Sequence, residues 1–93
     1  MNEVYIAKRR PEVGSEKFDP VKLHSSILAT CLAVRAYEGE AHIIAERVCT
    51  SVLKWLTRKT EVTSADIRRK TAEYLHIYHP EAAYLYEHQR IMV

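Results

Sequence analysis

The sequence predicts a mostly helical α+β fold, a four-helix bundle capped by an N-terminal β-hairpin with room for a short third strand. Three observations support this prediction. Residues 4–18 combine strand-forming and turn-forming residues, four later segments repeat apolar residues at helical spacing, and capping residues stand where those segments begin. At 93 residues the chain has the length of one domain, so residues 1–93 are expected to form a single unit.

The hairpin is predicted over about residues 4–18. Residues 4–7 are β-branched, aromatic and small, residues 11–15 supply turn chemistry, and residues 16–18 begin the return. Gly14 is expected to take the positive-φ position of the turn. An isolated hairpin is only marginally stable in water, so this one is expected to pack on the helices.

The first two helices are predicted over about residues 20–36 and 40–58. Asp19 and Pro20 mark the first start, since aspartate accepts from free N–H groups and proline suits the first helical position. Residues 37–39, with Gly39, are expected to break the pattern. The buried stripe of the first helix is expected to be Leu23, Ile27, Cys31 and Val34, flanked by Leu28 and Leu32. The inward residues of the second are expected to be Ile44, Val48, Val52, Trp55 and Leu56.

Residues 60–62 form a short extended link that can add the third strand. Thr63 and Asp66 have the spacing of a capping box, which predicts a helix over about residues 64–78. His79-Pro80 restarts the chain as a fourth helix over about residues 80–92, because proline disfavours helical geometry in the residue before it. The predicted inward residues are Ile67, Thr71, Tyr74, Leu75 and Tyr78 in the third helix and Leu85, His88, Ile91 and Met92 in the fourth.

Composition excludes several classes of protein. Hydrophobic residues at 47% and charged residues at 28% are typical of globular domains rather than disordered chains. No run approaches the roughly 20 apolar residues of a membrane span, and residues 1–4 lack the features of a signal peptide. We therefore expect a cytoplasmic protein without a membrane partner.

Metal and catalytic signatures are missing from the sequence. Cys31 and Cys49 have no CxxC spacing and are expected to be buried hydrophobes rather than zinc ligands or a disulfide. The five histidines are scattered, and the pair His76 and His79 has only the spacing of a weak surface site. With two glycines and no nucleophile elbow or Walker loop, the chain is expected to have no catalytic residues and no metal site.

Positive charge is local rather than global. The net charge is +2, while residues 8–10 and 68–70 form short basic clusters. Two such clusters fit one polyphosphate at least as well as a duplex, which needs a longer basic stripe. Nucleic acid is therefore not expected as a partner.

Polar residues gather at the junctions between predicted elements, and each has two interpretations. Lys8 and Arg9 leave the first strand together, which suits a phosphate or a solvated hairpin end. Asp19 can assist an anion or a purine at a helix start or only cap that helix, with Glu16 and Lys22 nearby as ligand groups or surface charges. Thr63 likewise needs no role beyond capping. On composition alone, the structural interpretation is favoured in every case.

Tyrosines are dense near the C-terminus, at Tyr74, Tyr78, Tyr84 and Tyr86. They can stack on a base, but tyrosine more often packs its ring and keeps its hydroxyl wet, and it is enriched at interfaces. Packing or self-association is the favoured interpretation.

Four segments in order resemble the ATP-cone family, the regulatory nucleotide-binding domain of ribonucleotide reductases and of the bacterial reductase-gene repressor. These segments are Val4-Tyr5-Ile6-Ala7-Lys8-Arg9, Glu16-Lys17-Phe18-Asp19-Pro20-Val21-Lys22-Leu23, Glu61-Val62-Thr63-Ser64-Ala65-Asp66-Ile67 and His79-Pro80-Glu81-Ala82-Ala83-Tyr84-Leu85. The resemblance covers residues 4–92. Each motif is short, but their order and spacing together are specific.

The resemblance implies a set of nucleotide-binding residues. Lys8 and Arg9 match the family's phosphate-contacting pair, and Ile6 and Phe18 match its apolar pocket walls. Its polar positions beside the base and ribose fall on Glu16, Asp19 and Lys22, and Glu16 can accept from the adenine amino group. The residues that would complete the pocket are Leu23, Thr63 and Ile67.

By resemblance, the function is allosteric: binding of ATP or dATP, with Mg²⁺, would control the oligomeric state or activity of a reductase or related protein. A homo-oligomer or a larger reductase subunit is the implied partner, and the chain is not expected to be an enzyme. Two alternatives stay open. One is a helical interaction module that has lost nucleotide binding, and the other is a nucleic-acid-binding fragment with weak, salt-dependent affinity.

Overall fold

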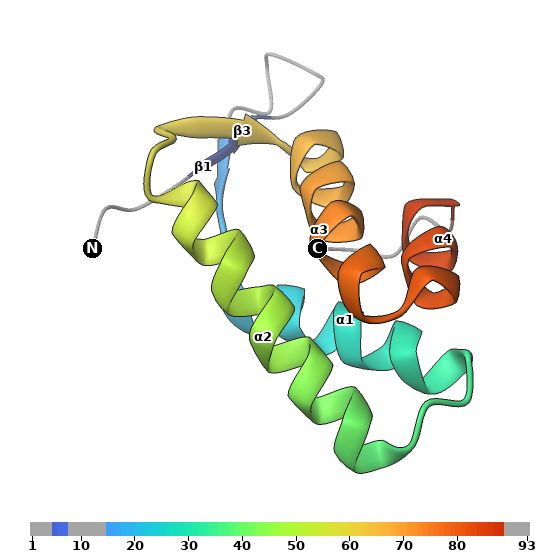
Figure 1. Cartoon of the computed structure of the whole chain (residues 1–93). Helices are drawn as coiled ribbons and strands as arrows, with labels where there is room; N and C mark the ends of the chain where they lie inside the picture. The colour runs from blue at the N-terminus through green and yellow to red at the C-terminus, as the bar shows by residue number, and fades with distance from the viewer. Residues whose placement is uncertain (1–4, 8–14, 89–93) are drawn as a thin grey trace.

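Four helices make up most of the chain that the computed structural model describes, which comprises residues 5–7 and 15–88 (Figure 1). They are α1 (Pro20–Ala33), α2 (Glu38–Leu56), α3 (Ser64–Tyr78) and α4 (Pro80–His88). The predicted mostly helical fold with four helices is therefore confirmed. Of the predicted fourth helix, residues 89–92 lie outside the described residues, and so do the predicted inward positions Ile91 and Met92.

Three short strands form a sheet at one end of the helices, β1 (Tyr5–Ala7), β2 (Ser15–Lys17) and β3 (Glu61–Thr63). Their order is β2-β1-β3, so the N-terminal strand is central. It runs antiparallel to β2 and parallel to β3. A parallel pair needs a long crossover, and here α1 and α2 provide it. The predicted turn around Gly14 lies outside the described residues.

The break between the first two helices lies earlier than predicted. Helix α1 ends at Ala33, and Arg35 has φ 63°, in the left-handed region. The Arg35 N–H donates to the Leu32 carbonyl at 3.0 Å and the Ala36 N–H to the Cys31 carbonyl at 3.1 Å. This pair of bonds is the Schellman arrangement that ends many helices, usually with glycine rather than arginine in the left-handed position.

Gly39 does not break the pattern, contrary to the prediction, because it lies in the first turn of α2. Tyr37 is the N-cap residue and its side chain makes no capping hydrogen bond. Glu38 and Glu40 stand in the first turn, where a carboxylate interacts favourably with the positive end of the helix dipole. Helix α2 therefore begins two residues before the predicted start.

The start of α4 depends on the residue between the last two helices. His79 is extended, at φ −156° and ψ 90°, as expected for the residue before a proline. Its Nδ1 accepts a hydrogen bond from the Ala82 N–H at 3.2 Å, so histidine acts as the cap of α4. The predicted restart at Pro80 is confirmed.

The core lies between all four helices and beneath the sheet. Helix α1 packs on α2 and α4, and α3 packs on α2 and α4. The buried apolar residues are Phe18, Leu23, Ile27, Cys31, Ala41, Ile44, Ala45, Val48, Cys49, Val52, Leu56, Val62, Ile67, Ala72, Leu75, Ala82, Ala83 and Tyr86. Both cysteines are buried and free, as predicted.

Some predicted inward positions are wrong, chiefly in α4. That helix buries Ala82, Ala83 and Tyr86 instead of Leu85 and His88, of which the first is half-buried and the second exposed. Ala82 and Ala83 have short side chains, which let α4 lie close to α3. The buried face of α4 is therefore rotated by about one residue relative to the predicted face. Leu32 and Tyr78 are also exposed, by 44% and 42%. None of the described helices is long and apolar enough to cross a membrane.

Candidate functional site

The sheet register brings three of the resembling segments together at the backbone level. Ile6 of the central strand is paired with Glu16 on one side and with Val62 on the other. Ala7 is paired with Thr63, the last residue of β3. The chain therefore leaves β1 towards residue 8 beside the start of α3. Lys8 and Arg9, the predicted phosphate contacts, lie outside the described residues.

The junction between β2 and α1 has one capping bond. Asp19 Oδ1 accepts from the Val21 N–H at 2.9 Å, and the Asp19 carbonyl accepts from the Leu23 N–H at 3.2 Å. No hydrogen bond from the described residues reaches Oδ2. Lys22 is exposed and makes no ion pair with a described residue. Asp19 is thus confirmed as a cap, and its second carboxylate oxygen and the Lys22 ammonium group have no partner among the described residues.

Two predicted pocket residues at this junction are buried. Phe18 is 8% exposed and Leu23 is fully buried, so both belong to the core cluster. Ile67 of α3 is also fully buried. Leu23 and Ile67 therefore pack in the core next to the starts of α1 and α3. In contrast, Asp19, Lys22 and Thr63 have exposed surface that a ligand could reach.

The start of α3 is a complete capping box, as predicted. The Asp66 N–H donates to Thr63 Oγ1 at 3.0 Å, and the Thr63 N–H donates to Asp66 Oδ2 at 3.2 Å. The hydrogen bond from the Thr63 backbone, assisted by the Thr63 side chain and by the Arg69 charge, holds the Asp66 pKa below its usual value. The Thr63 side chain is thus engaged with Asp66 within the box.

Arg68 is a candidate that the residue pattern alone did not single out. In the basic cluster 68–70, Arg69 pairs with Asp66 at 3.1 Å and Lys70 with Glu73 at 3.3 Å. Arg68 pairs with no described carboxylate, and its Nε atom is buried without a hydrogen-bond partner. An unsatisfied buried donor on a cation is unusual and suits an anion.

The sequence held a signal for Arg68. The neighbours of Arg68 one helical turn away in either direction are Ser64, Ala65, Thr71 and Ala72, none of them acidic. Its two basic neighbours each have a carboxylate three residues away on α3. A search for i,i+3 and i,i+4 partners would therefore have identified Arg68 as the unpaired cation of the cluster.

A buried hydrogen-bond chain links α1 with α4 beneath these junctions. Ser26 Oγ donates to the Leu23 carbonyl at 2.8 Å and lies 2.9 Å from the Tyr86 hydroxyl. In that second bond either hydroxyl can be the donor. Burial raises the pKa of Tyr86, opposed by hydrogen bonds to Ser26 and Thr71 and by the Arg68 charge. The packing interpretation of the tyrosines thus holds for Tyr86.

The two thiols are poorly suited to chemistry in the folded chain. Burial raises the pKa of Cys31 and of Cys49, with a further contribution from the Glu40 charge at Cys31, so both thiols stay protonated and poorly nucleophilic. Across residues 5–7 and 15–88, no three His, Cys, Asp or Glu side chains are grouped to hold a metal ion.

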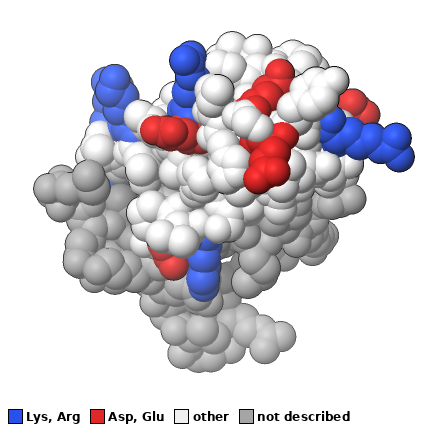
Figure 2. Space-filling view, turned by 90° about the horizontal axis from the view of Figure 1, so that it is seen from below, with Lys and Arg blue, Asp and Glu red and all other residues white. Residues whose placement is uncertain are grey.

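Surface charge on the described residues is mixed. Figure 2 shows one face of the molecule, on which basic and acidic side chains are interspersed and separated by uncharged surface. A duplex-binding face would instead present a continuous basic stripe. Such a stripe is absent from the described part of this face.

Comparison of the chain with protein-family models, with curated proteins and with solved structures finds no match.

Proposed function

We propose that the chain is a regulatory domain that binds an adenine nucleotide, ATP or dATP with Mg²⁺, and that it is not itself a catalyst. The nucleotide would lie against the β1-β3 pair and the starts of α1 and α3. The effect on a partner, a second copy or a larger reductase subunit, would follow from different affinities of its two states for the nucleotide.

The observation that carries the proposal is the register of the sheet. Ile6 is paired with both Glu16 and Val62, and the three segments that resemble the ATP-cone motifs meet on neighbouring strands. These segments are far apart in the sequence. Their meeting is what a shared pocket requires, with apolar walls and a few convergent polar groups.

Positively charged groups near the exit of β1 support binding of the nucleotide's phosphates. The pairing of Ala7 with Thr63 puts the exit of β1 beside the start of α3, where the Ser64 and Ala65 N–H groups take no part in the capping box and suit an anion. Arg68 adds a cation without a carboxylate partner in the described residues. A triphosphate needs several such donors, and hydrogen bonds between ionised groups are the strong ones.

Isothermal calorimetry with ATP, dATP and GTP in the presence of Mg²⁺ tests the proposal. Adenine-selective, saturable binding is expected, and Lys8→Ala/Arg9→Ala should abolish it. The matched control is Arg47→Ala/Lys54→Ala, which removes two exposed cations from α2 and should leave binding unchanged. Absence of heat with every nucleotide on a folded sample, or equal losses in both double variants, would contradict the proposal.

A helical interaction module without nucleotide binding is the second candidate. Apolar side chains are exposed on the described surface, with Tyr37 85%, Ile77 73% and Ile43 55% exposed. Exposed apolar residues are typical of interaction surfaces when they form a patch. Sedimentation velocity separates the two candidates, since a module would self-associate to the same extent with and without nucleotide.

A further inference from the structure

Helix α2 runs along one border of the molecule and has an exposed stripe on its outer side (Figure 1). The stripe, called here the α2 stripe, consists of exposed side chains three or four residues apart, namely Glu40, Ile43, Glu46, Arg47, Thr50 and Lys54. At its middle is a hollow of about 540 Å³, to which Tyr78 of α3 contributes. Ile43 is 55% exposed and Tyr78 is 42% exposed, so apolar surface lies between charged ends. An apolar centre with a polar border is typical of a protein interface.

The charges of α2 are separated by sign. The first half of the helix contains Glu38, Glu40 and Glu46 and no lysine or arginine. The second half contains Arg47 and Lys54 and no carboxylate. The helix dipole favours carboxylates in the first turn and cations in the last turn, but its effect does not extend to Glu46 and Arg47 in the middle.

These five charged side chains are unpaired within the described residues. The ion pairs there join residues of α3 only, and each joins a cation to a carboxylate three residues away, as Arg69 to Asp66 and Lys70 to Glu73. Within α2, no lysine or arginine lies three or four residues from a glutamate, so the helix has no internal pair to form. The charges of the α2 stripe therefore remain available to a partner.

We propose that the α2 stripe binds the α2 stripe of a second copy of this chain, with the two helices antiparallel. In that orientation the acidic half of each helix faces the basic half of the other, and the two helix dipoles oppose each other. A parallel pair would instead bring each glutamate near its own counterpart, and like charges repel. A two-fold contact needs a self-complementary surface, which a helix with separated charges provides.

The dimer is expected to be weak and sensitive to salt. A helix of 19 residues is about 28 Å long, so one stripe offers an interface at the small end of the usual range. Exposed ion pairs contribute about 1 kcal/mol or less each, and salt screens them. Ile43 and Tyr78 would therefore supply much of the affinity, and the charges would set the orientation.

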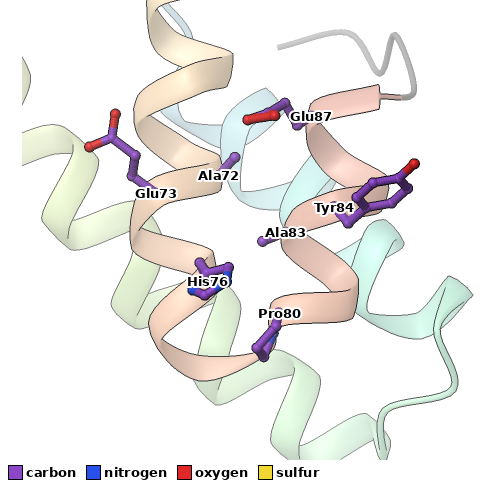
Figure 3. Close-up of a pocket in the computed structure, with 7 residues that line it drawn as sticks. All are labelled: Ala72, Glu73, His76, Pro80, Ala83, Tyr84 and Glu87. Atoms are coloured by element: carbon purple, nitrogen blue, oxygen red, sulfur yellow. The ribbon is translucent and has the colours of Figure 1, made fainter.

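The groove between α3 and α4 lacks these features (Figure 3). Two of its lining residues, Glu73 and Glu87, carry carboxylates. Figure 3 shows the Glu73 carboxylate turned away from the groove, and it is paired with Lys70 at 3.3 Å. Only Glu87 is left, and a single exposed carboxylate does not specify a partner. Of these two surfaces, only the α2 stripe is complementary to itself.

This inference goes beyond nucleotide binding and does not depend on it. The α2 stripe and Tyr78 lie away from the candidate nucleotide residues, which belong to the sheet and to the starts of α1 and α3. The dimer should therefore form equally with and without ATP, as a contact distinct from any that the nucleotide controls.

Sedimentation velocity of the full chain, from about 1 µM to about 500 µM, tests the proposal. A monomer–dimer equilibrium is expected, weaker in about 500 mM than in about 50 mM NaCl. Glu40→Lys and Lys54→Glu should each weaken the dimer at least about fivefold, because each places like charges across the contact. The double variant restores opposite charges and should return to within about twofold of the natural chain. Glu87→Lys on α4 changes the net charge equally and should have less than about a twofold effect.

The double variant also tests the orientation. In a parallel dimer it would still place like charges together, and only a mixture of the two single variants would associate. Association of that mixture without rescue in the double variant would therefore overturn the antiparallel arrangement. A monomer at every concentration, or equal effects of Glu40→Lys and Glu87→Lys, would overturn the proposal as a whole.

Two double variants separate this inference from the proposed function. Arg47→Ala/Lys54→Ala should weaken the dimer at least about tenfold and leave nucleotide binding unchanged. Lys8→Ala/Arg9→Ala should do the reverse. A dimer without any heat from nucleotides would contradict the proposed function alone, and nucleotide binding by a chain that stays monomeric would contradict the α2 dimer alone.

Discussion

The starts of α1 and α3 follow a strand in the same fold, yet they satisfy their polar groups differently. At α1, Asp19 makes one capping bond and Lys22 makes no ion pair with a described residue. At α3, Thr63 and Asp66 cap each other, and Arg69 pairs with Asp66. The side chains at the α3 start thus bond each other's backbone, whereas the α1 start leaves Asp19 Oδ2 and Lys22 without a partner among the described residues.

After folding, ligand-binding capacity remains in the groups that the helix caps do not use. A capping box uses its side chains for the helix, so Thr63 and Asp66 already bond each other before any ligand arrives. The unsatisfied charge on α3 is instead at Arg68, one turn further along. A helix start can therefore be closed structurally while its next turn keeps a free cation.

The largest expected effects come from the two buried residues that support the junctions. Leu23→Ala and Ile67→Ala should each lower the free energy of unfolding by about 2–5 kcal/mol, because both side chains are fully buried and a cavity would remain. Urea denaturation followed by circular dichroism measures this. Ile77→Ala, at a position that is 73% exposed, is the control and should cost less than about 0.5 kcal/mol. Equal losses at all three positions would show that the core does not lie where the structure has it.

Arg68→Met should affect the affinity for ATP much more than the free energy of unfolding. Methionine keeps much of the aliphatic length and removes an unsatisfied buried donor, so stability should change by less than about 1 kcal/mol. Affinity for ATP should fall by roughly tenfold or more, since a charged hydrogen bond is lost. Calorimetry and urea denaturation on the same sample separate the two effects.

Arg69→Met is the matched control, because Arg69 is already paired with Asp66 and is 65% exposed. It should change ATP affinity by less than about threefold if its charge acts only on Asp66. A similar loss in both variants would assign the effect to general positive charge rather than to the unpaired Arg68.

The two caps should differ in their contribution to stability. Thr63→Ala removes one half of a reciprocal box and should cost about 1–2 kcal/mol, and Asp19→Ala removes one bond and should cost about 0.5–1 kcal/mol. Thermal unfolding in the absence of nucleotide measures both. A larger cost for Asp19→Ala would reverse the comparison between the two helix starts.

The smallest effect is a pH dependence confined to the α3 start. The Asp66 pKa is lower in the folded chain than in the unfolded one, so its contribution to stability is present above about pH 4 and is lost as the pH falls through the folded value. Asp66→Asn should flatten the acid limb of the stability curve by a small amount. Urea denaturation between pH 2.5 and 6, values chosen to bracket about pH 4, tests this; an unchanged slope would contradict it.

Local sequence signals predicted much of the fold. The Asp19-Pro20 start, the Thr63–Asp66 box and the restart at Pro80 each depend on a few neighbouring residues, and all three are observed. The end of α1 was missed because Gly39 is the residue that favours a left-handed conformation in isolation, whereas the chain gives that conformation to Arg35.

Tertiary packing determines the features of the fold that local sequence signals did not predict. The inward face of α4 depends on how closely two alanines let it approach α3, and helical periodicity alone does not fix that rotation. For the candidate site, the positions of Asp19 and Thr63 followed from capping rules. The core burial of Leu23 and Ile67 did not follow from those rules, since a pocket wall and a core residue have the same apolar character.

The central position of β1 has a kinetic consequence. The parallel pair joins Tyr5 with Glu61, so it can form only when the intervening chain, which includes α1 and α2, has folded back on itself. Such long-range pairing is slow, and local helix contacts form first. Interactions made after the rate-limiting barrier act mainly on the unfolding rate. A molecule held between β1 and the start of α3 should accordingly lengthen the lifetime of the native chain far more than it hastens folding, and resistance to proteolysis would report it.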